Sequence, residues 1–437
     1  MNDNILLIGS GAREHAIAMA IDRSHTSSEL FCMASNLNPG ITSLCKELIV
    51  DDFNDPDIVV SYAKDHKIGL AIIGPENPLE KGVADALSNS NVNVIGPKKN
   101  LAQIETSKGF ARKLLDKHGI PGAPKFKIFS SMSGVGGFLD ELGENYVIKF
   151  DGLAGGKGVK VSGDHLQSKD EALDHCLQLV KNDSEFVIEE KFIGQEFSLM
   201  SFSDGKTLKH MPTVQDHKRA FAGDIGPNTG GMGTYSNHDH SLPFLIDSDI
   251  EEAQYINETT AKALKIEFGE GYKGILYGGF MATAKGVKLI EYNARFGDPE
   301  AMNVLSILGT DFVKICQAIA TERLHTIEVT FKKQATVCKY AVPNGYPENP
   351  VKGKPIDVSG VNDKNHLFYA SVDIENGTLV EVGSRTVAVV GIADTIGNAE
   401  KIAEKEISKI KGPLFHRKDI GTNTLVQKCI QQMERIR

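Results

Sequence analysis

The stretch YVIKFDGLAGGKGV, residues Tyr146 to Val159, joins a short apolar strand pattern to a loop rich in glycine. Lys149 interrupts the apolar pattern, and Lys157 lies in the loop. Glycine-rich loops expose backbone N–H groups, which bind phosphate together with a lysine ammonium. The P-loop pattern does not fit, because the glycine spacing differs and no serine or threonine follows Lys157. The stretch therefore indicates another kind of polyphosphate clamp, or a glycine-rich hairpin with a solvated lysine.

The composition describes an ordinary globular protein. A length of 437 residues predicts two to four domains. The net charge of -9 argues against non-specific binding to nucleic acid or to a membrane, since both would repel an acidic surface. The six scattered cysteines lack metal-binding spacing, and neither a signal peptide nor a membrane span is recognisable. These features predict a cytoplasmic protein with reduced thiols.

Short apolar strand patterns alternate with helical patterns over the first hundred residues. This alternation predicts βαβ units on a Rossmann-like parallel sheet, whose ligands bind at the carboxyl ends of the strands. Loops 9–14, 36–40 and 74–79 leave those ends. A helix is expected over 106–121, since it begins with Thr and Ser and stops at Gly-Ile-Pro.

The rest of the chain has a different pattern. Strands and hairpins around one helix near 169–182 predict a small α+β lobe, which a second sheet follows. After about residue 330 the chain is rich in strands and turns, and a last helix is expected over 397–411. The fold class is therefore a multidomain combination of α/β and α+β parts with a C-terminal β-rich domain.

GSGAREH, residues 9–15, follows a strand and opens a helix, so its N–H groups and the helix dipole suit an anion. A dinucleotide is disfavoured, because the second strand ends in Ser35 and Asn36 and not in an acid. A phosphate-bearing substrate fits better, with Arg13 as its counter-charge. The alternative is a tight turn that binds nothing.

Acidic residues follow two later strands. Glu189 and Glu190 must face opposite sides of a strand, so at most one of them faces the core. An acid there could accept hydrogen bonds from ribose hydroxyls or a base amine, and the alternative is that these are solvated glutamates at a strand end. In KLIEYNARFGDPE, residues 288–300, Glu291 and Asn293 are two apart and face one side, as ligands of one hard cation require. Arg295 shares that face if the strand continues.

QDHKRAFAGDIGPNTGGMGTYS, residues 215–236, contains five glycines and few apolar anchors. Such a segment suits a lid that closes over charged substrates, and the alternative is a disordered surface loop. The basic run after Asp216 favours the lid.

Taken in order, these motifs resemble the ATP-grasp superfamily, and within it the phosphoribosylamine–glycine ligase (glycinamide ribonucleotide synthetase) family. The resemblance runs from GSGAREH to HRKDIG at 416–421, and QDHKR with GPNTGGMG is its most specific part. It implies an N-terminal substrate-binding domain over 1–105, an ATP-grasp domain over 106–328 with a lid lobe at about 122–192, and a C-terminal β-rich domain over 329–437.

The resemblance also implies roles for single residues. Lys108 and Lys149 match lysines that contact ATP phosphates. The loop over those phosphates corresponds to Gly155, Gly156, Lys157 and Gly158. Adenine and ribose contacts correspond to Glu189, Glu190, Phe192 and Glu196. The Mg²⁺ (or Mn²⁺) ligands correspond to Glu291 and Asn293. Catalytic roles fall to Arg295, Lys149 and Asp298. Substrate contacts fall to Gly9, Gly11, Arg13, Glu14, Glu76, Asp216, Lys218, Arg219, Asn228, Gly230 and Asp298.

The implied reaction is ATP-dependent ligation of glycine to 5-phosphoribosylamine through glycyl phosphate in purine biosynthesis, by a monomer or weak dimer. Many relatives differ at Phe150, at Gly155, at Ala301 and Met302, and at the Asn-Pro-Gly of 38–40, so substrate contacts near these positions are open. Another ATP-grasp ligase or carboxylase is the alternative, although the strand LYGGFMAT carries glycines where many of those enzymes have a second metal-binding acid. A regulatory nucleotide-binding protein is less favoured, because Lys149, Glu291 and Asn293 are all present.

Overall fold

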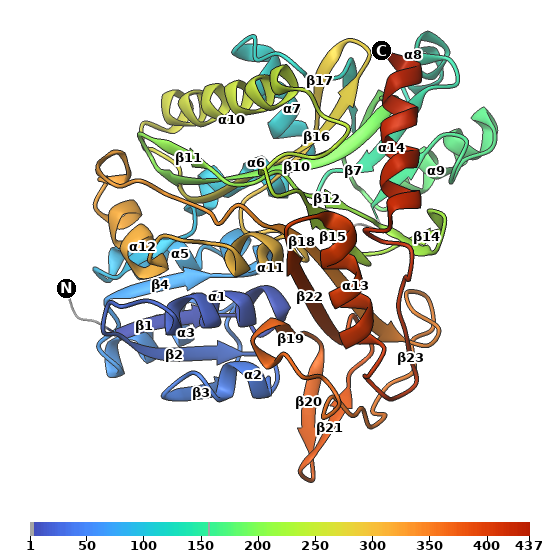
Figure 1. Cartoon of the computed structure of the whole chain (residues 1–437). Helices are drawn as coiled ribbons and strands as arrows, with labels where there is room; N and C mark the ends of the chain where they lie inside the picture. Colours follow the sequence, from blue (N-terminus) through green and yellow to red (C-terminus); the bar gives the residue numbers. More distant parts are fainter. Residues whose placement is uncertain (1–3, 156–157) are drawn as a thin grey trace.

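The computed structural model describes residues 4–155 and 158–437. Its N-terminal part is a five-stranded parallel sheet of order β3-β2-β1-β4-β5, drawn in blue in Figure 1. The strands β1 and β4 are buried apolar runs, as expected of a parallel sheet covered by helices. The elements are β1 (Asn4–Ile8), α1 (Ala12–Asp22), β2 (Glu29–Ala34), α2 (Pro39–Thr42), β3 (Glu47–Val50), α3 (Pro56–Asp65), β4 (Leu70–Ile73), α4 (Glu76–Lys81), α5 (Val83–Asn89) and β5 (Asn93–Ile95).

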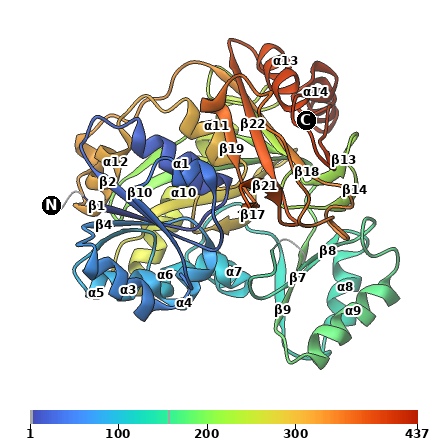
Figure 2. The same cartoon turned by 90° about the horizontal axis from the view of Figure 1, so that it is seen from below.

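Two consecutive helices lead from this sheet to a small lobe. The lobe sheet is antiparallel with the order β6-β9-β7-β8, and the lobe has a hydrophobic core of its own. Figure 2 shows β7, β8 and β9 with their two helices standing out from the rest of the molecule. The elements are α6 (Lys99–Thr106), α7 (Lys108–Lys117), β6 (Phe126–Phe129), α8 (Val135–Leu142), β7 (Tyr146–Phe150), β8 (Val159–Val161), α9 (Lys169–Lys181) and β9 (Phe186–Glu190).

A second antiparallel sheet of order β11-β10-β16-β17 follows the lobe. Helix α10 contacts β16 and β17, whereas α12 contacts β10 and β16. The elements are β10 (Gly194–Asp204), β11 (Leu208–His210), α10 (Asp247–Phe268), β16 (Lys273–Thr283), β17 (Gly286–Asn293), α11 (Glu300–Ser306), α12 (Phe312–Ala320) and the short 3₁₀ helix η1 (Leu324–Thr326).

The C-terminal part is built on a six-stranded sheet, in which β12-β15-β18-β22-β19 form the path and β23 also pairs with β18. Two separate hairpins, β13–β14 and β20–β21, extend from it. The elements are β12 (Gln215–Asp216), β13 (Arg219–Phe221), β14 (Ile225–Asn228), β15 (Gly233–Ser236), β18 (Ala335–Pro343), η2 (Lys364–His366), β19 (Leu367–Tyr369), β20 (Val372–Glu375), β21 (Thr378–Glu381), β22 (Val387–Ala393), α13 (Ile396–Ile407), β23 (Leu414–Phe415) and α14 (Asn423–Ile436).

The expected fold class is confirmed, but three local expectations are wrong. The lobe has a second helix, α8, whose two glycines weaken its sequence signal. The expected last helix ends at Ile407, and α14 follows it. Segment 215–236 is not a loop, because it holds β12, the β13–β14 hairpin and β15.

One large hydrophobic core runs through the N-terminal sheet, the second antiparallel sheet and part of the C-terminal sheet. The lobe and one side of the C-terminal sheet have separate cores. We propose to keep the expected domains 1–105, 106–328 and 329–437, with the lobe at about 122–192, although β12 and β15 of the second domain pair into the sheet of the third. Among the described residues, no helix is long and apolar enough to cross a membrane.

Candidate active site

A cavity of about 970 Å³ opens between the lobe, the second sheet and the C-terminal part. This volume lies at the upper end of the range for small-molecule sites. Of the predicted site residues, those that line it are Arg13, Glu76, Lys108, Lys149, Gly155, Gly158, Glu189, Glu190, Phe192, Glu196, Asp216, Lys218, Arg219, Asn228, Gly230, Glu291, Asn293, Arg295 and Asp298. Gly9, Gly11 and Glu14 are not among its lining residues, and Gly156 and Lys157 lie outside the described residues.

Lys149 enters the cavity from β7, and its position is fixed by buried charge. Glu189 on the neighbouring strand β9 pairs with Lys149 and accepts two hydrogen bonds from Arg112, at 2.7 and 3.0 Å. The Lys149 ammonium also donates to the Ile290 carbonyl at 2.8 Å. Burial lowers the pKa of Lys149, although Glu189 opposes that shift. Glu190, the next residue, is exposed, so the two acids do face opposite sides of the strand.

Lys108 begins α7, where Ser107 caps the helix by accepting from the Phe110 N–H. The Lys108 ammonium donates to the Gly152 carbonyl at 2.9 Å, and so touches the glycine-rich loop. The Phe150 ring packs over that loop, and a β-carbon on Gly152 would lie 2.5 Å from the ring. The phenylalanine that departs from many relatives is therefore accommodated by glycine beside it.

Glu291 and Asn293 lie two apart on β17, and both line the cavity. Burial opposes ionisation of Glu291, but Lys218, Lys149, Lys108 and Arg295 outweigh it and lower its pKa. Among the described residues, no hydrogen bond or ion pair is made by the Glu291 carboxylate. An ionised, unpaired carboxylate beside an amide oxygen fits one hard cation that completes its shell with phosphates and water.

The residue opposite Glu291 on β16 is Gly279, so that strand supplies no second acid there. No group of three or more His, Cys, Asp or Glu among the described residues could hold a metal by itself. The donor set therefore fits a cation that the substrate phosphates help to bind, and does not fit an all-protein metal site.

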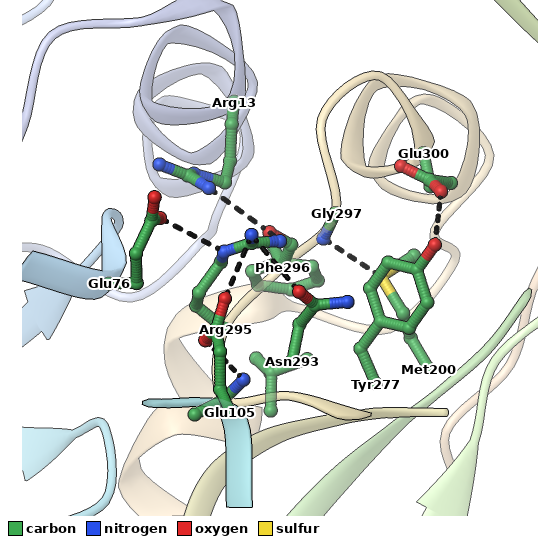
Figure 3. A network of polar contacts seen from close by, with 12 residues as sticks. Arg13, Glu76, Glu105, Met200, Tyr277, Asn293, Arg295, Phe296, Gly297 and Glu300 are labelled. Carbon is green, nitrogen blue, oxygen red and sulfur yellow. Dashed lines mark hydrogen bonds and ion pairs between the residues drawn. The ribbon is translucent and has the colours of Figure 1, made fainter. Parts of the chain in front are cut away.

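Arg295 lies at the centre of a polar network (Figure 3). Its guanidinium pairs with Glu76 at 3.2 Å and Glu105 at 2.9 Å, and donates to Asn293 Oδ1 at 3.2 Å. Burial opposes ionisation of Glu76, but Arg295 and Arg13 lower its pKa to about 2. The network joins the N-terminal sheet to the proposed cation ligands, and it holds Arg295 charged at the cavity wall.

Asp298 follows on the loop after β17. It accepts a hydrogen bond from the Tyr340 hydroxyl at 2.7 Å and pairs with Arg385 at 3.2 Å. Arg385 also donates to the Gly230 and Asp298 carbonyls, and it lies over the Tyr340 ring. Tyr340 and Arg385, both from the C-terminal part, therefore hold Asp298 in place.

Two further carboxylates line the cavity near Asp298. Glu300 is buried and accepts from the Tyr277 hydroxyl at 2.6 Å, as Figure 3 shows. Asp216 Oδ1 is buried without a hydrogen-bond partner among the described residues. Burial raises the pKa of Asp216, and the nearby Glu300 raises it further. Lys218 on the same segment pairs with Glu196. The cavity thus has a cationic side around Glu291 and an anionic side around Asp216.

The turn at Gly9 to Glu14 is already filled by its own glutamate. Glu14 accepts from the Gly11 N–H at 2.6 Å and from Arg13 at 2.6 Å. A β-carbon on Gly74 would lie 2.1 Å from Glu14 Oε1, so this close approach needs glycine. In this conformation the Gly11 N–H is bonded to the Glu14 carboxylate and is not free to bind a phosphate.

Five residues of the site were not predicted from sequence, namely Glu105, Arg112, Tyr277, Tyr340 and Arg385. Glu105 and Arg112 flank the predicted S-K-G-F motif, so their position near Lys108 was the available signal. Glu300 was noted only as a neighbour of Met302. Nothing in the local sequence marks Tyr340 or Arg385.

The fold and the cavity together define the ATP-grasp class. An antiparallel lobe and a second antiparallel sheet enclose a cavity lined with lysines, with the side-chain oxygens of Glu291 and Asn293 beside them on β17. Models of phosphoribosylglycinamide synthetase domains match this chain over residues 3–105 (N domain), 106–301 (ATP-grasp domain) and 336–423 (C domain). The chain belongs to the phosphoribosylglycinamide synthetase family of ATP-dependent ligases.

Individual relatives agree with this assignment. The chain is 49% identical to the phosphoribosylamine–glycine ligase of Methanosarcina barkeri, over 99% of each chain. It is also similar to the crystal structure of the enzyme of that name from Thermotoga maritima, with 27% identity, a TM-score of 0.80, and coverage of 95% of this chain and 100% of the other. The biotin carboxylase domain of Hydrogenobacter thermophilus 2-oxoglutarate carboxylase, solved with MgADP, shares the fold at 15% identity, with a TM-score of 0.72 and coverage of 99% and 94%.

The two residues at 301–302, which differ from those of the family pattern, do not line the cavity. Ala301 and Met302 are fully buried in the main core on α11, and neither lines the cavity. Asn38 is also buried, where it caps α2 and donates to the Ser10 and Tyr369 carbonyls at 2.8 and 2.9 Å. The Asn-Pro-Gly turn thus ties the N-terminal sheet to the C-terminal part.

Proposed function

We propose that this protein joins glycine to 5-phosphoribosylamine at the expense of ATP, forming glycinamide ribonucleotide, ADP and phosphate. The observation that carries the proposal is that residues from all three family-matched segments meet at one cavity, among them Arg13, Lys149, Glu291 and Arg385. The names of the relatives supply the substrates.

The cationic side of the cavity suits ATP. Lys108 and Lys149 would hold its phosphates, and the segment from Glu189 to Phe192, with Glu196, would hold the nucleoside. Glu291 and Asn293 would hold a magnesium ion, whose charge would offset the negative charge that develops in phosphoryl transfer. Manganese would accept the same oxygen ligands, so magnesium is our choice from its usual partnership with ATP.

Glycine carries one positive and one negative group, and the cavity offers both signs. Arg295 would bind the glycine carboxylate, which takes the γ-phosphoryl group of ATP to become glycyl phosphate. The amine of phosphoribosylamine then attacks the carbonyl carbon, the bond from that carbon to the phosphate oxygen breaks, and the nitrogen loses a proton. Asp298, held by Tyr340 and Arg385, would orient these groups.

The remaining substrate contacts follow from position. We assign the ribose phosphate to the Gly9, Gly11, Arg13 and Glu14 turn with Glu76, where Glu14 must move or bind a ribose hydroxyl. We assign the other substrate contacts to Asp216, Lys218, Arg219, Asn228 and Gly230, which also line the cavity.

Phosphate release from ATP with magnesium tests the proposal. Release that requires glycine and phosphoribosylamine together, and that falls strongly in Glu291→Ala, is the expected result. Release with a different acid or amine would contradict the substrates and retain the ATP-grasp class. If Glu291→Ala loses phosphate release with magnesium but regains normal release when manganese is added, the assignment of Glu291 as a cation ligand would be contradicted.

Location and assembly remain proposals. All six cysteines are free, and five of them are buried, which fits a reducing compartment such as the cytoplasm. The expectation of a monomer or weak dimer, with no nucleic-acid or membrane partner, stays a prediction.

A further inference from the structure

The β13–β14 hairpin forms one wall of the cavity, but it has little structure of its own. Within the part of the chain that the structure describes, its two strands pair only with each other, over residues 219–228. Phe221 and Ile225, its large apolar side chains, are 47% and 62% exposed. An isolated two-stranded hairpin without a buried apolar face is marginally stable in water. The hairpin therefore needs contacts from elsewhere to hold a fixed position.

The C-terminal segment 415–419 supplies those contacts, and Arg417 is their centre. Arg417 is 2% exposed, and it donates to the Arg219 carbonyl at 3.0 Å and pairs with Asp224 at 2.9 Å. Both contacts are on the hairpin. Its remaining N–H groups bond to the two oxygens of Asp419, at 3.0 and 2.7 Å.

Asp419 extends the same connection. It accepts a hydrogen bond from the Gly223 N–H at 2.9 Å, at the tip of the hairpin. The Phe415 ring lies 6.1 Å from the Phe221 ring. Segment 415–419 thus touches β13 and the turn at the hairpin tip, so Arg417 and Asp419 of the HRKDIG motif have a structural task that the reaction itself leaves unassigned.

We propose that Arg417 is a positioning residue, which holds the β13–β14 hairpin against the cavity so that Lys218, Arg219 and Asn228 face the substrates. The proposal rests on the proposed function of the cavity. Arg417 does not line the cavity, so it acts through the hairpin and not by touching substrate. Among the described residues, the ion pair that joins the hairpin to the lobe is Arg219 with Asp164 at 3.0 Å. That pair is partly exposed and contributes little, so the contacts of segment 415–419 contribute most to holding the hairpin in place.

The first test is hydrogen exchange, which does not depend on activity. In Arg417→Ala, peptides covering 217–230 should exchange faster, because the Gly223 N–H and the hairpin strands lose their anchor. Ile407→Ala is the matched control, since Ile407 is buried in the separate core of the C-terminal part and contacts no hairpin residue named here. If the two variants lower the melting temperature equally, Ile407→Ala should leave hydrogen exchange in 217–230 unchanged. Equal exchange in both variants would overturn the proposal.

The second test is kinetic. Misplacement of substrate-positioning groups should lower kcat/KM for phosphoribosylamine and glycine by about 10- to 100-fold in Arg417→Ala. Arg417→Lys should recover part of the loss, because a lysine keeps the charge but cannot reach all four acceptors in a fixed geometry. Asp224→Asn should lower activity in the wild-type background and have no further effect in Arg417→Ala.

The two tests separate the inference from the proposed function. A wild-type protein without ligase activity would contradict the proposed function, while the exchange comparison would still decide whether Arg417 anchors the hairpin. A fully active Arg417→Ala would overturn the positioning role. If Arg417→Ala does not fold, Asp224→Asn makes the same comparison, and unchanged exchange in 217–230 would then contradict the anchor.

Discussion

Replacing Glu189 with glutamine should destabilise the protein more than any other single neutralisation at the cavity wall. The Glu189 carboxylate is the shared partner of Arg112 and Lys149, and the exposed fractions of the three side chains are 3–4%. Glutamine keeps the size but removes the negative charge. Two cations then lie buried next to each other, and their acceptors, the Ile290 carbonyl and the glutamine amide oxygen, are both neutral.

The magnitude follows from the cost of breaking a buried ion pair, about 3–5 kcal/mol when one partner is removed. This corresponds to a roughly 150- to 5,000-fold change in the unfolding equilibrium constant. The total stability of a domain is only about 5–15 kcal/mol, so the change consumes a large share of it. Activity should fall as well, since Glu189 orients the Lys149 ammonium.

Urea unfolding followed by far-UV circular dichroism measures the effect, because the chain contains no tryptophan for fluorescence. Glu190→Gln is the matched control, since Glu190 is the next residue of β9 and is exposed on the opposite face. That control should change stability by no more than about 0.5 kcal/mol. Equal urea midpoints for the two variants would refute the reasoning that a desolvated carboxylate holds the two cations.

Three further predictions concern other buried groups. The pKa of Glu76 is about 2 in the folded state against 4.5 normally. The ionised carboxylate therefore stabilises the fold above about pH 4.5 by up to about 3 kcal/mol, and this stabilisation is lost as the pH falls towards 2. The difference in urea stability between wild type and Glu76→Gln should accordingly close on acidification. Met302→Gln should lose about 1–3 kcal/mol in urea unfolding because a buried amide lacks a partner, with KM values unchanged. Asp216→Asn should raise the melting temperature, because burial disfavours its charge, and should lower kcat/KM about tenfold or more if Asp216 contacts substrate.

Local patterns in the sequence were sufficient for several parts of the structure. The buried runs of β1 and β4 predict the parallel sheet, because a strand covered on both faces is apolar throughout. The side-by-side oxygens of Glu291 and Asn293 follow from the two-residue period of a strand. Helix α14 was missed, although its cap at Thr422 and the buried Leu425, Cys429 and Met433 form a helical pattern.

Long-range pairing of charges was not predictable in the same way. Arg112 is 77 residues from Glu189, and the Asp298 carbonyl is 87 residues from Arg385. A single charged residue in a sequence reads equally well as a solvated side chain, because solvated charges are the common case. Only the fold removes such a residue from water, and burial then makes its partner obligatory.

The same physics explains why the lid expectation at 215–236 was wrong in form. Its glycines and charges match a loop that is mobile in isolation, and the hairpin indeed buries little apolar surface. Arg417 and Asp419, about 200 residues later in the chain, convert that segment into a fixed wall. Order at this wall of the cavity therefore comes from buried hydrogen-bonded charge supplied by the C-terminal part, so a change in segment 415–419 should alter substrate binding without touching a substrate.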